Sequence, residues 1–490
     1  MLKDLNLKKN ALENTPQKDI PSPSSIFRKI ASQLKKPRKK NLYLIFLSLI
    51  FALLFVIYPY HAKRQETKKV SNSQLDKRSR SPTKALVTRV PTITQTPNLT
   101  PLPEKLVKTA SGRIAFVMDG EVYVVNADRN DLQQITDDEY KKFGLQVSPD
   151  KMKIVYSFYP EDSEKQTNSG MYVGYNSGVA FVDVESKKVT VLIPYGNIQN
   201  HYANWTPDSR YITVWVGNGL GSKVIDTVLN STILNLSSSD GKASISPVVW
   251  VKGKNKISYI LNNSLYLANV DGSEAVKLKD GVDALRQVHE GPNVPEPPFW
   301  SGSGRFAAYY KDGFLNLYDS VNITEVVVGK ATKEDMFESN YPQTYLTSYS
   351  SNEMKLFFLE YDQKPTAVSF DIVTGKRENI GSFGQSMVIS PDKKTLFALT
   401  NEPYSNSPVG FHNLETGELK TCGSDFRHSY YWWAGGLGYN TSLSVWSPDN
   451  SVVVGSGTSG RDYGTVKVML IDCTNYEIVR GNISERVWFP

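Results

Sequence analysis

Cysteine and histidine are scarce in this chain of 490 residues. Its two cysteines, Cys422 and Cys473, are too few for a disulfide-rich scaffold or a zinc cluster built on cysteine. They allow a single disulfide, but two unpaired thiols are the simpler interpretation. The five histidines show no H-E-x-x-H or comparable ligand spacing. The sequence therefore predicts no metal site and no cofactor.

The large C-terminal part also lacks the basic surface that a nucleic-acid-binding protein needs. The net charge is +7, but residues 1–41 and 61–110 each carry +8, which leaves −9 for residues 111–490. Contacts with phosphates require a positive footprint. We therefore expect no nucleic-acid partner.

Long apolar runs are absent except for one. Leu42–Tyr58 is seventeen residues long and carries no charge, which is the lower limit for a helix that spans the hydrocarbon core. A cleaved signal peptide would have a shorter run with small residues before the cut, and forty-one residues precede this one. We predict an uncleaved transmembrane helix at 42–60, so that the protein is a single-pass membrane protein.

The charges beside this run predict its orientation. Seven cations lie in residues 26–40 and four in residues 61–75, so residues 1–41 are expected to form a basic cytoplasmic tail. Residues 61–109 are basic and then rich in Ser, Thr and Pro, a composition typical of a disordered or extended stalk. The remaining residues, 110–490, are expected to lie outside the cytoplasm.

A repeat fills residues 110–490. An apolar residue, often Trp, precedes a Ser/Thr-Pro-Asp or glycine turn, and a hydrophobic strand follows. The spacing varies between 40 and 58 residues, which is typical of β-propeller blades with variable loops. Each unit also contains further short strands between turn residues. The repeat positions are Val147, Trp205, Trp250, Trp300, Tyr349, Ile389 and Trp446.

The two ends of this region complement each other. "GRIAFVM", "EVYVVNA" and "LQQIT" look like strands two to four of a blade, and the final "ERVWFP" looks like a first strand. Joining them closes the ring and leaves no open edge. The predicted fold is all-β, a propeller of eight blades with a split closing blade. If the unit at Tyr349 is not a blade, the number is seven.

The Ser/Thr-Pro-Asp turns resemble the WD40-like repeat of TolB-type β-propellers. They occur at 148–150, 206–208, 390–392 and 447–449. The repeat is also similar to the N-terminal propeller domain of dipeptidyl peptidase IV. That family adds a hydrolase domain, and this chain has no G-x-S-x-G elbow for one. The resemblance implies a propeller fold for residues 110–490 but no enzymatic activity.

One face of such a propeller would carry the long connections. Residues 421–442 form one of them, and Trp432 and Trp433 there are not needed by the repeat. Aromatic rings with polar tips on a concave face suit sugar rings or peptide side chains. The alternative is a loop that packs its own aromatics into a plug over the channel. The predicted ligand-binding residues are Tyr430, Tyr431, Trp432, Trp433, Tyr439, Tyr172 and Tyr175.

These features favour a binding module. We expect a membrane-anchored, extracytoplasmic propeller that binds an envelope polymer or a protein partner. The alternative is an enzyme that processes a glycan or peptide at the channel mouth. Its candidate residues are His201 and His428 with Glu161 or Asp425, but no spacing assigns a catalytic role to them. A scaffold or sensor that signals through the tail is a third, less favoured hypothesis.

Overall fold

A computed structural model describes most of the C-terminal part of the chain. The described residues are 112–160, 176–199, 201–216, 221–237, 244–283, 285–286, 294–295, 297–330, 344–361, 365–382, 387–399, 408–423, 426, 445–455 and 464–489. All belong to the second of two compact units, Asn98–Pro490. These residues contain no helix that is long and apolar enough to cross a membrane. The predicted span at 42–60 and the predicted stalk lie outside them.

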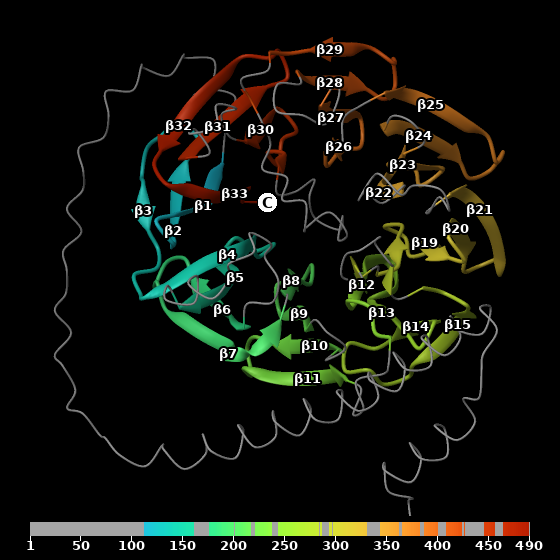
Figure 1. The fold of residues 1–490 in the computed structure, drawn as a ribbon, viewed down its shortest axis with the longest axis horizontal. Coiled ribbons are helices and arrows are strands. Elements are labelled where there is room, and N and C mark those ends of the chain that lie inside the picture. The colour runs from blue at the N-terminus through green and yellow to red at the C-terminus, as the bar shows by residue number, and fades with distance from the viewer. Residues whose placement is uncertain are drawn as a thin grey trace, which may run out of the picture. The chain divides into compact units, whose positions relative to one another are not determined.

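The described residues form eight antiparallel blades arranged in a ring (Figure 1). Blades 1 to 3 are β4 (Tyr140–Val147) to β7 (Val189–Gln199), β8 (His201–Trp205) to β11 (Ser231–Leu236), and β12 (Val249–Val251) to β15 (Val276–Asp280). Between these ends lie β5 (Lys153–Pro160), β6 (Asn176–Asp183), β9 (Tyr211–Val216), β10 (Gly221–Asp226), β13 (Lys256–Leu261) and β14 (Ser264–Ala268).

Blades 4 to 6 follow a short hairpin, β16 (Leu285–Arg286) with β17 (Val294–Pro295). Blade 4 contains β18 (Phe299–Trp300), β19 (Phe306–Lys311), β20 (Phe314–Asp319) and β21 (Thr324–Lys330). Blade 5 contains β22 (Thr344–Tyr349), β23 (Lys355–Tyr361), β24 (Pro365–Asp371) and β25 (Arg377–Ser382). Blade 6 contains β26 (Met387–Ile389), β27 (Thr395–Leu399), β28 (Val409–Asn413) and β29 (Leu419–Thr421). The unit at Tyr349 is therefore a blade, and eight is the confirmed number.

Blade 7 has a shortened inner strand in the described residues. Its sheet contains β30 (Val452–Gly455), β31 (Thr465–Leu470) and β32 (Asn475–Arg480). Where the other blades have a first strand, a single bridge joins Trp446 to Val453. Trp446 therefore occupies its repeat position, although the bridge to Val453 is the only pair formed there in the described residues.

The closing blade is split between the two ends of the propeller, as predicted. β33 (Ile483–Trp488) pairs antiparallel with β1 (Arg113–Met118), with Ile114 opposite Trp488. The sheet continues through β2 (Glu121–Asn126) and β3 (Gln133–Gln134). Figure 1 shows β33 beside β1 at the point where the ring closes. Because this pairing spans the whole propeller, the ring needs both ends of the domain.

Apolar layers between neighbouring blades form the core. Between blades 1 and 2, Val155 and Val179 pack with Trp205, Ile212 and Val214, all of them buried. The second strand of a blade is covered on both faces, and this explains nearly continuous apolar runs such as "IVYSF" in β5 and "YITVWV" in β9. An amphipathic strand with one solvated face would alternate instead.

The Ser-Pro-Asp turn is held by its own side chains. The Ser390 hydroxyl, fully buried, donates to Asp392 (2.6 Å) and accepts from the backbone N–H of Thr395 (3.0 Å). Asp392 also accepts from the backbone N–H of Lys394 (3.1 Å), and Lys393 takes a positive φ of 65°. The turns at Ser148, Thr206 and Ser447 repeat these bonds. The motif is therefore a self-contained first-to-second strand turn.

At three repeat positions an aromatic side chain ties a blade to the one before it. Trp205 donates its indole N–H to the carbonyl of Gln146, and Trp446 donates to that of Val388, both at 3.2 Å. The Tyr349 hydroxyl donates to the carbonyl of Phe299 at 3.1 Å. In each pair the acceptor stands one residue before the repeat position of the preceding blade. Trp and Tyr thus combine burial with a directed bond between blades.

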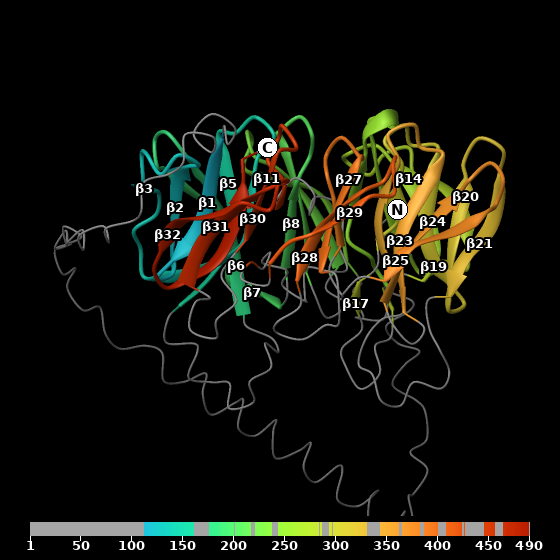
Figure 2. The same cartoon turned by 90° about the horizontal axis from the view of Figure 1, so that it is seen from above.

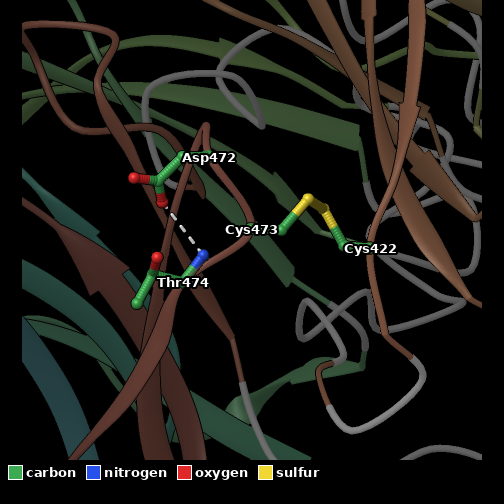
Figure 3. Close-up of a disulfide and its surroundings, with 4 residues drawn as sticks. All are labelled: Cys422, Asp472, Cys473 and Thr474. Atoms are coloured by element: carbon green, nitrogen blue, oxygen red, sulfur yellow. Dashed lines mark hydrogen bonds between the residues drawn. A yellow bond between two sulfur atoms is a disulfide. The ribbon is translucent and has the colours of Figure 1, made fainter.

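Cys422 and Cys473 form a disulfide, so the interpretation as two unpaired thiols is wrong (Figure 3). The sulfurs are 2.04 Å apart and the Cα atoms 5.2 Å apart, across a sequence separation of 51 residues. Cys422 follows the last strand of blade 6, and Cys473 lies in the turn between β31 and β32 of blade 7. Because these blades are neighbours, the ring brings together two cysteines that are distant in sequence.

Candidate functional site

The propeller has two faces that differ in their connections. We call the edge with the first-to-second and third-to-fourth strand turns the turn face, and the opposite edge the loop face. The turn face consists of short hydrogen-bonded turns such as 148–153 and 183–188. The segments outside the described residues between 161 and 463 connect blade strands whose ends lie on the loop face, the lower edge in Figure 2. The exceptions are 284, 287–293 and 296, which lie beside or within the β16–β17 hairpin. The longer connections thus belong to one face, as the repeat predicted.

The seven predicted ligand-binding residues lie outside the described residues. They are Tyr430, Tyr431, Trp432, Trp433, Tyr439, Tyr172 and Tyr175. Of the candidates for the enzymatic alternative, Glu161, Asp425 and His428 also lie outside them, and His201 is described only as a backbone position in β8. The choice between a ligand-binding surface and an aromatic plug therefore stays a prediction.

The described structure does show where the segment 427–444 begins and ends. On one side, Cys422 is linked to blade 7, and Phe426 is fully buried with its ring 6.0 Å from that of Phe397. On the other side, Val445 is buried next to Trp446. All of these residues belong to one apolar cluster between blades 6 and 7. Both ends of the segment are thus fixed to the core.

Aromatic side chains also lie toward the loop-face end of blade 1. The Tyr140 ring packs edge-on against Phe158 with centroids 5.1 Å apart, and Phe143 packs against Tyr159 at 5.5 Å. Tyr140 is 39% exposed, and Tyr195 in β7 is 41% exposed. The connection 161–175, which contains Tyr172, follows directly after β5, the strand that carries Phe158 and Tyr159. A ligand on the loop face would meet aromatic groups of blade 1 as well.

A buried charge cluster joins the closing blade to blade 1 at the same edge. The Lys142 ammonium, fully buried, contacts Glu121 (2.7 Å), Asp138 (2.5 Å) and the carbonyl of Tyr140 (2.5 Å). Thr136 donates to Glu121 at 2.6 Å. Burial raises the pKa of Glu121 above its usual value, against the opposing effect of Lys142 and Thr136. This cluster could not be predicted from the sequence, because "EYKKFG" looks like an exposed charged segment.

Polar side chains also link the inner strands of three consecutive blades. Glu485 in β33 accepts from the backbone N–H of Leu145 at 3.0 Å, at an irregularity in the β4–β5 pairing. Gln146 then donates to Asn204 of β8 at 2.8 Å. Burial raises the pKa of Glu485. These bonds hold the closing blade, blade 1 and blade 2 in register around the centre of the ring.

The described residues hold no group of three or more His, Cys, Asp or Glu side chains placed to bind a metal ion. Many of their charged side chains form ion pairs, some within a blade, such as Arg305 with Asp319, and some between blades, such as Lys279 with Glu325. What this part of the molecule shows is a closed ring of blades with its longer connections on one face.

Comparisons with known proteins show similarity in fold. No protein-family model and no curated protein matches the chain. A dihydro-haem d1 dehydrogenase is 11% identical, with 81% of this chain and 78% of that chain covered and a TM-score of 0.50. TolB from Acinetobacter baumannii is 15% identical, with 64% and 79% covered and a TM-score of 0.32. An oligogalacturonate lyase in complex with manganese is 11% identical, with 72% and 96% covered and a TM-score of 0.41.

The predicted propeller is thus confirmed by the blades themselves, and TolB is among the structures similar to it. At such low identities the similarity extends to the fold alone. The finer resemblance to the propeller of dipeptidyl peptidase IV stays a prediction.

Proposed function

We propose that this protein is a membrane-anchored, extracytoplasmic β-propeller that binds an envelope polymer or a protein partner through its loop face. One observation carries the proposal: the longer connections, including 161–175 and 427–444, all attach to this face. Binding residues concentrate in loops that a rigid scaffold positions. The turn face, by contrast, is built from short turns whose polar groups bond to one another.

The position at which the chain enters the propeller supports this choice of face. β1 begins at Arg113 on the turn face, where the carbonyl of Arg113 accepts from the backbone N–H of Phe489 at 2.9 Å. The proposed stalk therefore joins the domain on the side opposite to the long connections. A stalk at the turn face leaves the loop face free for a partner.

The disulfide supports the proposed compartment. Disulfides persist in oxidising environments and are rare in the reducing cytosol. Cys422 and Cys473 form one that ties blade 6 to blade 7. The proposed anchor is the apolar run Leu42–Tyr58, with the basic tail 1–41 in the cytoplasm.

The test uses the full chain in detergent and its Trp432→Ala/Trp433→Ala double variant. Aromatic residues in a binding surface are often energetic hot spots worth about 2 kcal/mol or more, so affinity should fall roughly 30-fold. The measurement is cosedimentation with insoluble envelope polymers purified from the producing organism. The matched control is Val228→Ala/Leu229→Ala, two residues of the turn face that are 74% and 64% exposed.

The control should bind like the wild type, and circular dichroism should show all three proteins folded. Equal retention of wild type and double variant would favour the aromatic plug. Release of soluble fragments from the polymer would favour the enzymatic alternative.

A further inference from the structure

The hairpin of β20 and β21 in blade 4 exposes an unusual number of apolar side chains. Between Phe314 and Lys330 five large apolar residues are exposed to solvent. They are Phe314 (39%), Val321 (64%), Ile323 (77%), Val326 (44%) and Val327 (56%). Exposed apolar side chains that lie this close together on one hairpin mark an interaction surface.

The outer edge of this hairpin is an open strand edge. β21 pairs with β20 on one side and is the last strand in its sheet, so in the described part of the chain no strand pairs with its other side. An edge of this kind offers unpaired N–H and C=O groups to another strand. The natural occupant is therefore an extended backbone rather than a helix or a small molecule.

Most other outer strands carry features that discourage such pairing. The outer strand of blade 2, β11, is also uncharged, but its exposed residues, Ser231, Thr232 and Asn235, are polar. Lys277 and Lys279 lie in β15, and Arg377 and Glu378 lie in β25. β3 and β29 are two and three residues long, and β7 contains Pro194. Charges, short length and proline all protect sheet edges. The segment Thr324–Val327 of β21 has one charged residue, Glu325.

That charge is directed inward. Glu325 accepts from the Tyr309 hydroxyl at 2.8 Å and pairs with Lys279 of blade 3 at 2.6 Å and with Lys311 at 3.3 Å. Its side chain is 17% exposed. The outward edge of β21 is therefore close to neutral, although the sequence "TEVVV" contains an acid.

We propose that β21 is the interface through which two copies of this chain associate, by antiparallel pairing of β21 with β21 of the second copy. A second copy supplies an extended, neutral, apolar strand of matching composition. Pairing about a two-fold axis at Val326 sets Val326 opposite itself and Glu325 opposite Val327, so no like charges meet. The apolar side chains of the two hairpins then cover each other.

The test is a charge exchange at Val326 in the full chain in detergent. Val326→Lys places two lysines opposite each other, and Val326→Asp places two carboxylates opposite each other. Each variant alone should dimerise at least about tenfold more weakly than the wild type, because like charges repel across the pair. An equimolar mixture of the two should dimerise again. Sedimentation velocity measures all three, and Val191→Lys in β7, where Val191 is 47% exposed, is the matched control.

A second variant reports the geometry directly. Val326→Cys should form a disulfide between two copies under mild oxidation, since the native cysteines are already paired with each other. Val191→Cys should not. A wild type that stays monomeric up to roughly 100 µM would overturn the proposal. Dimers that Val326→Lys leaves intact would also overturn it, because they would form elsewhere, for instance through the apolar run at 42–58. Binding of β21 only to a different protein would overturn it as well.

Discussion

At the scale of single residues, the repeat is explained by hydrogen bonds. Ser390 is buried because its hydroxyl serves both the Asp392 carboxylate and the backbone N–H of Thr395. Such a turn can be recognised in the sequence, because all the residues that form its hydrogen bonds lie within six positions of one another. Lys142 shows the opposite case. It lies next to Lys141 in the sequence and is buried because Glu121 and Asp138 surround it after folding. No local pattern distinguishes the two lysines.

Asp319 gives a prediction for pH. Hydrogen bonds from Arg305 lower the pKa of Asp319 from its usual 3.8 to about 2, with help from the backbone N–H groups of Val321 and Asn322. Because the folded pKa is depressed, the ionised carboxylate stabilises the fold above about pH 4, and this contribution is lost as the pH falls toward 2.

The Asp319→Asn variant should therefore have a lower free energy of unfolding than the wild type at pH 7. The difference should shrink as the pH falls from about 4 to about 2. Urea unfolding of both proteins across this range measures it. A difference that is constant with pH would show that the carboxylate charge is not involved.

At the scale of elements, the sequence predicted blades better than the contacts between them. Strand runs such as "KISYIL" and turns such as "VKGKN" identify β13 and the turn before it, because both patterns are local. The split closing blade followed from two incomplete units. The disulfide did not follow, because its 51-residue separation has meaning only once blades 6 and 7 are known to be neighbours. The aromatic candidates in 421–442 depend on connections whose side chains no repeat specifies.

The disulfide should matter for stability. Replacing both cysteines, Cys422→Ser/Cys473→Ser, removes a link that closes a loop of about 51 residues. Such links stabilise proteins by about 2–4 kcal/mol, largely by restricting the unfolded chain. Guanidinium unfolding of wild type and variant measures the loss. The wild type under reducing conditions should unfold like the variant, and unchanged stability in both cases would contradict the assignment.

At the scale of the whole molecule, pairing between its two ends closes the propeller into a ring. β33 supplies the inner strand for β1, and Trp488 is buried in the cluster between blade 7 and the closing blade. The closure covers the inner edge of β1, which would be open in a linear array of blades. The fold could be predicted because this closure leaves a mark at both ends of the sequence. The function could be predicted only as a class, since the fold supports many activities.

Deleting residues 483–490 tests the closure. The deletion takes the inner strand from the closing blade and exposes the layers on both sides of it. We expect loss of cooperative thermal unfolding and strong binding of a hydrophobic dye, as in compact states without fixed packing. Adding a synthetic peptide of residues 483–490 should restore part of the transition. A truncated chain with the melting curve of the wild type would show that the ring does not depend on β33.

Hydroxyl-radical footprinting of the full chain shows whether the partner binds to the loop face. The protein would be oxidised with and without insoluble envelope polymers purified from the producing organism, and modified peptides would be compared. We expect protection of 161–175 and 427–444, with unchanged oxidation of turn-face residues such as Val228 and Leu229. Protection of the turn face instead, or no protection on either face while the polymer retains the protein, would contradict this expectation.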